Sequence, residues 1–120
     1  MARGHRLGRR GEAMAAAYLL EQGYRILARN WRHHHKELDI VAEKGEVLVI
    51  VEVKTREDPA QPAGELVPPE KEHALIEAAD AFIRQHDLDK EVRFDVIIIT
   101  MPAGGAPTLE HIPGAFYPTL

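Results

Sequence analysis

The sequence predicts an α/β fold in which helices cover both faces of a central sheet. Two segments carry apolar residues at the i, i+3, i+4 spacing of helices, and the other segments are rich in β-branched residues. Residues 47–51 are apolar throughout, which is typical of a central strand covered on each side. The length of 120 residues predicts a single domain over residues 1–120.

The first half of the chain is predicted to form a helix and three strands. Residues 9–22 are rich in alanine and leucine, which favour a helix, and Gly23 is suited to end it. The second and third strands flank Lys44-Gly45, which predicts a hairpin with a two-residue turn. The three strands are expected over residues 24–31, 37–43 and 46–54.

The second half is predicted to form a loop, a helix and one or two strands. Residues 55–67 contain two prolines and a glycine and show no apolar period, so we expect a loop. Residues 68–70 open the second helix, because proline is tolerated and an acid is favoured in a first turn. Residues 92–100 are expected to form a strand and residues 109–112 a short last one.

Composition excludes several classes of protein. The chain has no cysteine, so disulfides and thiolate metal sites are excluded. The longest apolar runs, residues 47–51 and 96–99, are too short to span a membrane. The basic N-terminus lacks the apolar stretch of a secretory signal. We therefore expect a cytoplasmic protein that does not associate with membranes.

The charge is distributed unevenly along the chain. Residues 1–36 carry eight Lys or Arg against two acids, a net +6, while residues 37–120 carry seven against seventeen, a net −10. A basic stretch attracts the phosphate backbone of nucleic acids, and an acidic remainder can collect divalent cations. Chance clustering of surface charge is the alternative.

Polar residues interrupt the apolar third strand at its end. Glu52 and Lys54 lie two residues apart, so in a strand their side chains share one face. A turn at Lys44-Gly45 pairs Asp39 with Ile50, which places Asp39 diagonal to Glu52 on that face. We therefore expect both carboxylates within reach of one ion.

This combination predicts metal-dependent phosphodiester hydrolysis. Buried carboxylates need compensation, and Mg²⁺ or Mn²⁺ supplies it through oxygen ligands. The ion polarises a phosphoryl oxygen, and Lys54 is placed to orient the attacking water or to neutralise developing charge. An acid-x-Lys triplet also arises by chance, and its plain interpretation is a local ion pair at a solvent-exposed strand end.

An ordered set of motifs resembles the bacterial YraN-type family, which is similar to archaeal Holliday junction resolvases and to the restriction-endonuclease-like, PD-(D/E)xK superfamily. The resemblance covers nearly the whole chain. It is carried by Gly8-Arg9-Arg10-Gly11-Glu12, Ala28-Arg29-Asn30, Glu37-Leu38-Asp39-Ile40, Val51-Glu52-Val53-Lys54-Thr55-Arg56, Arg93-Phe94-Asp95-Val96 and His111-Ile112 with Ala115-Phe116.

The resemblance implies a restriction-endonuclease-like αβββαβ core with a mixed central sheet. It also implies that Asp39, Glu52 and the backbone carbonyl of Val53 bind the metal ion and that Lys54 is the catalytic lysine. Glu12 matches the further acid of resolvase-like members, both as a metal ligand and as a catalytic residue. A first-turn acid stabilised by the helix dipole is the alternative for Glu12.

Further residues are candidates for nucleic-acid binding. Arg9 and Arg10 are expected to contact phosphate, and Lys71 matches a lysine that recurs in the family; the alternative for all three is a solvated surface position. Consecutive histidines over residues 33–35 point in different directions and do not predict a metal site. Trp31 and Asp95 are expected to serve packing and structural hydrogen bonding.

The leading hypothesis is thus a Mg²⁺- or Mn²⁺-dependent endonuclease whose nucleic-acid partner is DNA rather than RNA, with branched or recombination-type DNA as the implied substrate. A non-catalytic nucleic-acid-binding module of the same fold is the alternative. A third hypothesis is a protein-interaction adaptor whose acidic surface binds a basic partner protein. Similarity to resolvases also implies a homodimer.

Overall fold

The chain forms two helices and five strands in a computed structural model that describes residues 2–60 and 67–118. Apolar periodicity and β-branched runs place the elements close to where the sequence predicts them. In chain order they are α1 (Ala2–Glu21), β1 (Arg25–His33), β2 (Lys36–Lys44), β3 (Val47–Arg56), α2 (Pro69–Gln85), β4 (Glu91–Thr100) and β5 (Thr108–Phe116).

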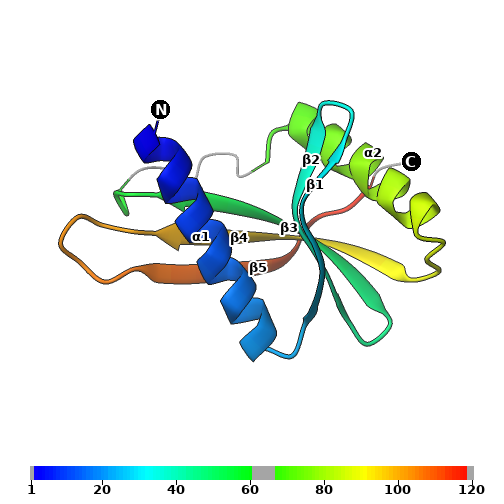
Figure 1. Cartoon of the computed structure of the whole chain (residues 1–120), viewed down its shortest axis with the longest axis horizontal. Coiled ribbons are helices and arrows are strands. Elements are labelled where there is room, and N and C mark those ends of the chain that lie inside the picture. The colour runs from blue at the N-terminus through cyan, green and yellow to red at the C-terminus, as the bar shows by residue number, and fades with distance from the viewer. Residues whose placement is uncertain (1, 61–66, 119–120) are drawn as a thin grey trace.

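The five strands form one mixed sheet in the order β1-β2-β3-β4-β5 (Figure 1). Strand β3 pairs with β2 antiparallel and with β4 parallel, and α2 makes the crossover between β3 and β4. The expected α/β class, with a mixed central sheet flanked by helices, is confirmed, and the arrangement is compatible with a restriction-endonuclease-like core.

Each face of the sheet has its own apolar core, and one helix covers each face (Figure 1). Helix α1 packs Ala15 and Leu19 against β3 residues Val49 and Val51. Helix α2 packs Leu75 and Phe82 against the face that carries Leu38, Leu48 and Ile50. Strand β3 is buried on both faces, as its continuous apolar run predicts. Glu52, the polar residue that directly follows this run, therefore lies deep in the molecule.

Several predicted boundaries are wrong. Helix α1 begins at Ala2 and not at residue 9, because the residues before residue 9 carry no proline and no regular apolar stripe is needed to continue a helix beyond its packed face. Strand β3 continues to Arg56, so the loop predicted over residues 55–67 starts later; residues 61–66 of the predicted loop lie outside the described residues. Strand β5 is a full strand, Thr108–Phe116, and not a short one over residues 109–112.

The predicted hairpin register is also wrong, by two residues. Lys44 pairs with Val47 and Ile40 with Val51, so the turn is Gly45-Glu46 and Asp39 does not pair with Ile50. Gly45 has a φ of 60°, and two-residue hairpin turns place a positive φ at their first position. A shift of two residues preserves the face to which a side chain points.

No helix in the described part of the chain combines the length and the apolar character that crossing a membrane requires.

Candidate functional site

Two acidic side chains lie where β2 and β3 separate. Pairing between the two strands ends at Ile40 and Val51, and the next residues along them are Asp39 and Glu52. Asp39 Oδ2 accepts a hydrogen bond of 2.9 Å from the backbone amide of Val53. The Asp39 side chain thus accepts the hydrogen bond of a β3 backbone amide at the point where backbone pairing between β2 and β3 stops.

Glu52 is buried by the sheet and by α2, and it is only partly satisfied. The residue is 5% exposed, and its Oε1 atom has no hydrogen-bond partner among the described residues. The other oxygen, Oε2, lies 3.5 Å from Lys54 Nζ and 3.6 Å from Lys71 Nζ. The expectation that Glu52 and Lys54 share a face is therefore met. The carboxylate has positive charge on one side and an unpaired oxygen on the other.

The pKa of Asp39 is raised from 3.8 to about 8. Burial is the largest cause, the negative charge of Glu52 is the second, and the charge of Glu12 adds a smaller contribution. The hydrogen bond from the Val53 amide opposes these effects but does not cancel them. Two neighbouring carboxyl groups therefore resist being ionised together, so the pair holds a proton more tightly than an isolated carboxyl group does unless a cation compensates the charge.

Glu12 is held close to this pair by the way α1 meets β3. Gly11 makes the approach possible, because a Cβ there would lie 2.1 Å from Thr55 Oγ1. Asn30 Nδ2 donates a 2.8 Å hydrogen bond to Glu12 Oε1. In the described part of the chain, however, no three His, Cys, Asp or Glu side chains are grouped closely enough to bind one metal ion. Glu12 influences Asp39 electrostatically rather than completing a three-carboxylate cluster.

The Asp39–Glu52 pair fits a hard divalent cation. Mg²⁺ is commonly held by only one or two protein carboxylates, with water and substrate phosphate as its other ligands. The unpaired, buried Oε1 atom of Glu52 is an available oxygen ligand. The carbonyl of Val53 stays a prediction as a third ligand; the described contact of Val53 with the pair is made by its amide.

The predicted nucleic-acid-binding residues lie in two places. Arg9 and Arg10 are exposed on α1. Lys71, in the first turn of α2, instead contacts the buried Glu52. Trp31 packs edge-to-face on Phe82, with ring centroids 5.1 Å apart, as a packing residue would. Lys71 is thus placed to meet a phosphate that approaches the carboxylate pair.

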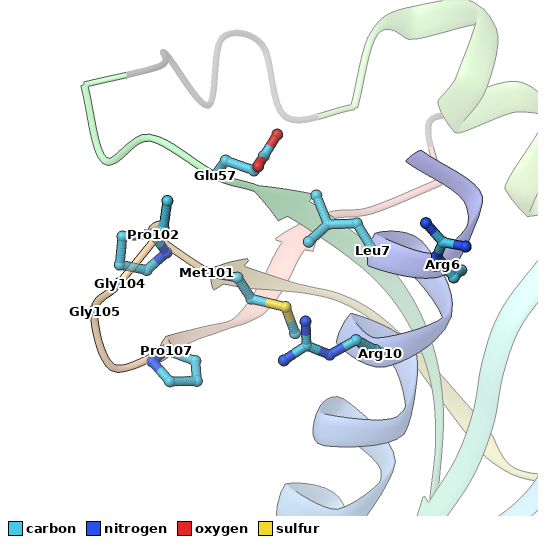
Figure 2. A pocket seen from close by; sticks show the side chains of 10 residues that line it. Arg6, Leu7, Arg10, Glu57, Met101, Pro102, Gly104, Gly105 and Pro107 are labelled. Carbon is cyan, nitrogen blue, oxygen red and sulfur yellow. The ribbon is translucent and has the colours of Figure 1, made fainter. Parts of the chain in front are cut away.

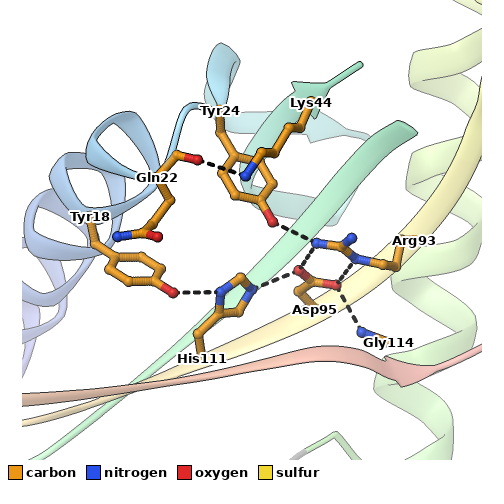
Figure 3. Close-up of polar contacts among 8 residues, drawn as sticks. All are labelled: Tyr18, Gln22, Tyr24, Lys44, Arg93, Asp95, His111 and Gly114. Atoms are coloured by element: carbon orange, nitrogen blue, oxygen red, sulfur yellow. Dashed lines mark hydrogen bonds and ion pairs between the residues drawn. The ribbon is translucent and has the colours of Figure 1, made fainter. Parts of the chain in front are cut away.

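A second buried carboxylate, Asp95 on β4, is fully satisfied (Figure 3). Both of its oxygens accept hydrogen bonds of 2.8 Å from Arg93, and Oδ1 also accepts one of 3.0 Å from the Gly114 amide. His111 Nε2 lies 2.7 Å from Oδ2, and its Nδ1 lies 2.9 Å from the Tyr18 hydroxyl. These partners outweigh burial and lower the pKa of Asp95.

Sequence reasoning missed most of this network. Only Arg93 gives a signal, since it lies two residues before Asp95 on the same strand and so on the same face. His111 and Gly114 reach Asp95 from β5, and Tyr18 joins through His111 from α1. The contacts link three elements that no local pattern connects.

Comparison with known proteins gives consistent matches over the whole chain. The family described as "Uncharacterised protein family UPF0102" matches residues 11–99. A UPF0102 protein of Bacteroides thetaiotaomicron is 48% identical over 122 residues, covering 100% of this chain and 99% of the relative. One of Parabacteroides distasonis is 43% identical over 118 residues, covering 98% and 97%. One of Anaeromyxobacter dehalogenans is 46% identical over 112 residues, covering 92% and 83%.

Proposed function

The chain belongs to the UPF0102 family, as the resemblance of its motifs to the YraN-type family predicts, and we propose that it is a metal-dependent endonuclease acting on DNA. One observation carries the proposal. Glu52 is buried with an unpaired oxygen, directly across the strand separation from Asp39. A pair of this kind is costly to bury unless a cation compensates it.

The two lysines do not remove the need for a cation. Lys54 and Lys71 both approach Oε2 of Glu52, at 3.5 and 3.6 Å, which is longer than the roughly 2.7–2.9 Å of a charge-assisted hydrogen bond. Among the residues that the structure describes, they leave Oε1 and the whole of Asp39 without a positive partner. A divalent ion would meet both carboxylates from that side.

The residues then divide into binding and positioning roles. Asp39 and Glu52 would hold Mg²⁺ or Mn²⁺, with the Val53 carbonyl as a further ligand. The ion, when bound, polarises a phosphoryl oxygen and lowers the pKa of an attacking water. Lys54, ion-paired to Glu52, orients that water or neutralises charge that develops on the phosphate. Lys71 holds a substrate phosphate, and Glu12 adds negative charge that favours cation binding.

The surface near the site suits a polyanion. Arg9 and Arg10 are exposed on α1, the helix that also carries Glu12. Cationic side chains bind DNA through its phosphates and release counterions on binding. We expect binding that weakens steeply with salt and, from the likeness to resolvases, a preference for branched DNA.

A cleavage assay with matched variants tests the proposal. Hydrolysis of branched, single-stranded and duplex DNA is compared in Mn²⁺, Mg²⁺ and EDTA, using wild type, Asp39→Asn and Lys54→Met. We expect Mn²⁺-dependent cleavage by the wild type and a loss of at least about a hundredfold in each variant. Asp80→Asn and Lys44→Met change the same residue types at exposed positions and serve as controls.

Calorimetric titration with Mn²⁺ separates metal binding from turnover. Asp39→Asn should abolish binding of the ion, whereas Lys54→Met should retain it. If all proteins bind DNA in a salt-sensitive manner and none cleaves, the endonuclease proposal is wrong. The chain would then be a non-catalytic nucleic-acid-binding module.

A further inference from the structure

A second feature of the molecule is a cavity of about 570 Å³ between the first turns of α1 and the loop that joins β4 to β5 (Figure 2). Its volume is in the range of pockets that bind small molecules. Arg6, Leu7 and Arg10 line it from α1, and Met101 and Pro102 line it from the opposite side. Neither Asp39 nor Glu52 lines it, so the cavity is separate from the carboxylate pair.

The α1 side of the cavity is cationic. Arg6 and Arg10 are four residues apart, so their side chains lie on the same face of the helix. Neither guanidinium forms an ion pair with the side chains that the structure describes. Guanidinium groups bind phosphate with two parallel hydrogen bonds. Glu57 also lines the cavity, and its negative charge offsets part of the positive charge of the two arginines. An anion bound here therefore needs specific contacts in addition to long-range electrostatic attraction.

The opposite side is apolar and built by a tight turn. Met101 is only 7% exposed, and the thioether end of its side chain faces Arg10 and Leu7 in Figure 2. Gly104 has a φ of 72°, and the Gly105 amide donates a 3.2 Å hydrogen bond to the Pro102 carbonyl. A Cβ at Gly105 would lie 2.9 Å from Pro102 Cγ. The turn therefore presents a preformed wall against which a flat ring can pack.

We propose that this cavity binds one unpaired nucleotide of the DNA. Arg6 and Arg10 hold its phosphate, and its base contacts the apolar side chains that line the cavity: Leu7 on the α1 side and Met101 and Pro102 on the opposite side. This inference rests on the proposed function in taking DNA as the ligand. A base inside a duplex is stacked on its neighbours and cannot reach a concave wall, while a base that is already single-stranded pays little to enter one.

The position of the cavity relative to the carboxylate pair supports this assignment. The cavity lies on the face of the sheet that α1 covers, whereas Glu52 and Lys71 lie on the face that α2 covers; the chain that leads along β3 from Glu52 to Glu57 connects the two places. Five residues of extended chain span about 16 Å. A DNA strand with its phosphate at the carboxylate pair can therefore place an unpaired nucleotide a few positions further along the strand in the cavity. The substrate class inferred is DNA with a single-stranded extension or junction.

Methionine signals allow a direct test. The chain has three methionines, so ¹³C-methyl labelling of methionine gives few NMR signals, and a Met101→Leu variant assigns that of Met101. A DNA hairpin with a single-stranded extension is titrated in EDTA, where cleavage cannot interfere, and compared with the same hairpin with a blunt end. We expect the extension, and not the blunt end, to shift the Met101 methyl signal through the ring current of a base.

Charge-matched variants complete the test. An Arg6→Gln/Arg10→Gln variant should bind the extended hairpin at least about tenfold more weakly than wild type, as expected for the loss of an arginine–phosphate contact. This variant should also bind the extended and the blunt hairpin with the same affinity. Arg9→Gln, on the same helix but outside the cavity lining, should weaken binding of both hairpins equally.

Three results would overturn the inference: a Met101 signal that does not move, one that moves equally with the blunt hairpin, or one that moves with deoxythymidine monophosphate but with no DNA. The first two deny a nucleotide subsite, and the third makes the ligand a free nucleotide. The NMR measurement needs no cleavage, so it tests the nucleotide subsite independently of the proposed nuclease activity. If the protein cleaves no DNA but its Met101 signal shifts with the extended hairpin, the nuclease proposal is wrong and the subsite is supported.

Discussion

Asp39 and Asp95 are two aspartates of one sheet, and their side chains differ in the hydrogen-bond partners that the chain supplies. Asp95 is completely buried and receives hydrogen bonds from Arg93 and Gly114 and a contact from His111, so its pKa is lowered. Asp39 has one amide donor and a neighbouring carboxylate, so its pKa is raised to about 8. A carboxylate that serves the fold is supplied with partners by the chain. One that is left short of partners is suited to a ligand from outside.

The largest effect that this comparison predicts is the loss of stability in Asp95→Ala. The variant leaves the Arg93 guanidinium, 29% exposed, beside an empty and buried position. Removing one partner of a buried ion pair costs about 3–5 kcal/mol, and we expect the lower end because Arg93 is partly solvated. Urea unfolding at pH 7 measures the change. Asp95→Asn keeps the side-chain volume and one hydrogen-bond acceptor, so its free energy of unfolding is measured instead if the alanine variant does not fold.

The exposed pair Asp80–Arg84 on α2 is the matched control for this experiment. Asp80→Ala removes an ion pair of the i, i+4 type and should change the free energy of unfolding by no more than about 0.5 kcal/mol. If Asp95→Ala were equally mild, the network around Asp95 would not be structural and the contrast with Asp39 would fail.

Asp39 should show the opposite response, which appears as a dependence of stability on pH. The folded protein holds a proton at Asp39 more tightly than the unfolded chain, whose aspartates have a pKa near 3.9. Between about pH 4 and pH 8 the stability contributed by this group therefore falls as the pH rises. Asp95, with a lowered pKa, contributes stability that is present above about pH 4 and lost on acidification.

Asp39→Asn removes the ionisable group and should make the metal-free protein more stable than wild type at pH 8–9, by on the order of 2 kcal/mol. Near pH 4 the two proteins should be similar. Urea unfolding in EDTA across this pH range provides the measurement. A destabilised Asp39→Asn variant at high pH would show that the carboxylate is needed for the fold, and the metal-site interpretation would lose its main support.

The sequence predicts which side chains of β3 share a face better than it predicts the register of β3 with β2. Alternation along β3 correctly places Glu52 and Lys54 on one face, because that rule needs no knowledge of the partner strand. The sequence places the predicted hairpin turn one residue too early, because Gly45 occupies the first position of the turn and not the second. The error of two residues kept every side chain on its face, so the convergence of Asp39 and Glu52 was still anticipated.

The Asp95 network and the cavity near α1 could not be predicted in the same way. Both depend on segments far apart in the sequence: Tyr18 and Asp95 are linked through His111, and Arg10 of α1 and Met101 of the β4–β5 loop line the same cavity. Local patterns locate strands and helices, but the packing angle of α1 on the sheet decides which loops it reaches. That angle depends on close approaches such as Gly11 on Thr55.

The smallest predicted effect concerns Tyr24, which helps to hold Arg93 in place. Arg93 Nη2 donates a 2.7 Å hydrogen bond to the Tyr24 hydroxyl and also binds Asp95 (Figure 3). Tyr24→Phe removes only that acceptor and should lower the free energy of unfolding by about 1 kcal/mol. Tyr117→Phe changes an exposed tyrosine and should have almost no effect. If Tyr24 acts by fixing the guanidinium for Asp95, its effect should shrink in an Asp95→Asn background, and a double-mutant cycle measures that coupling. Additive effects would mean that Tyr24 stabilises the protein independently of the Asp95 network.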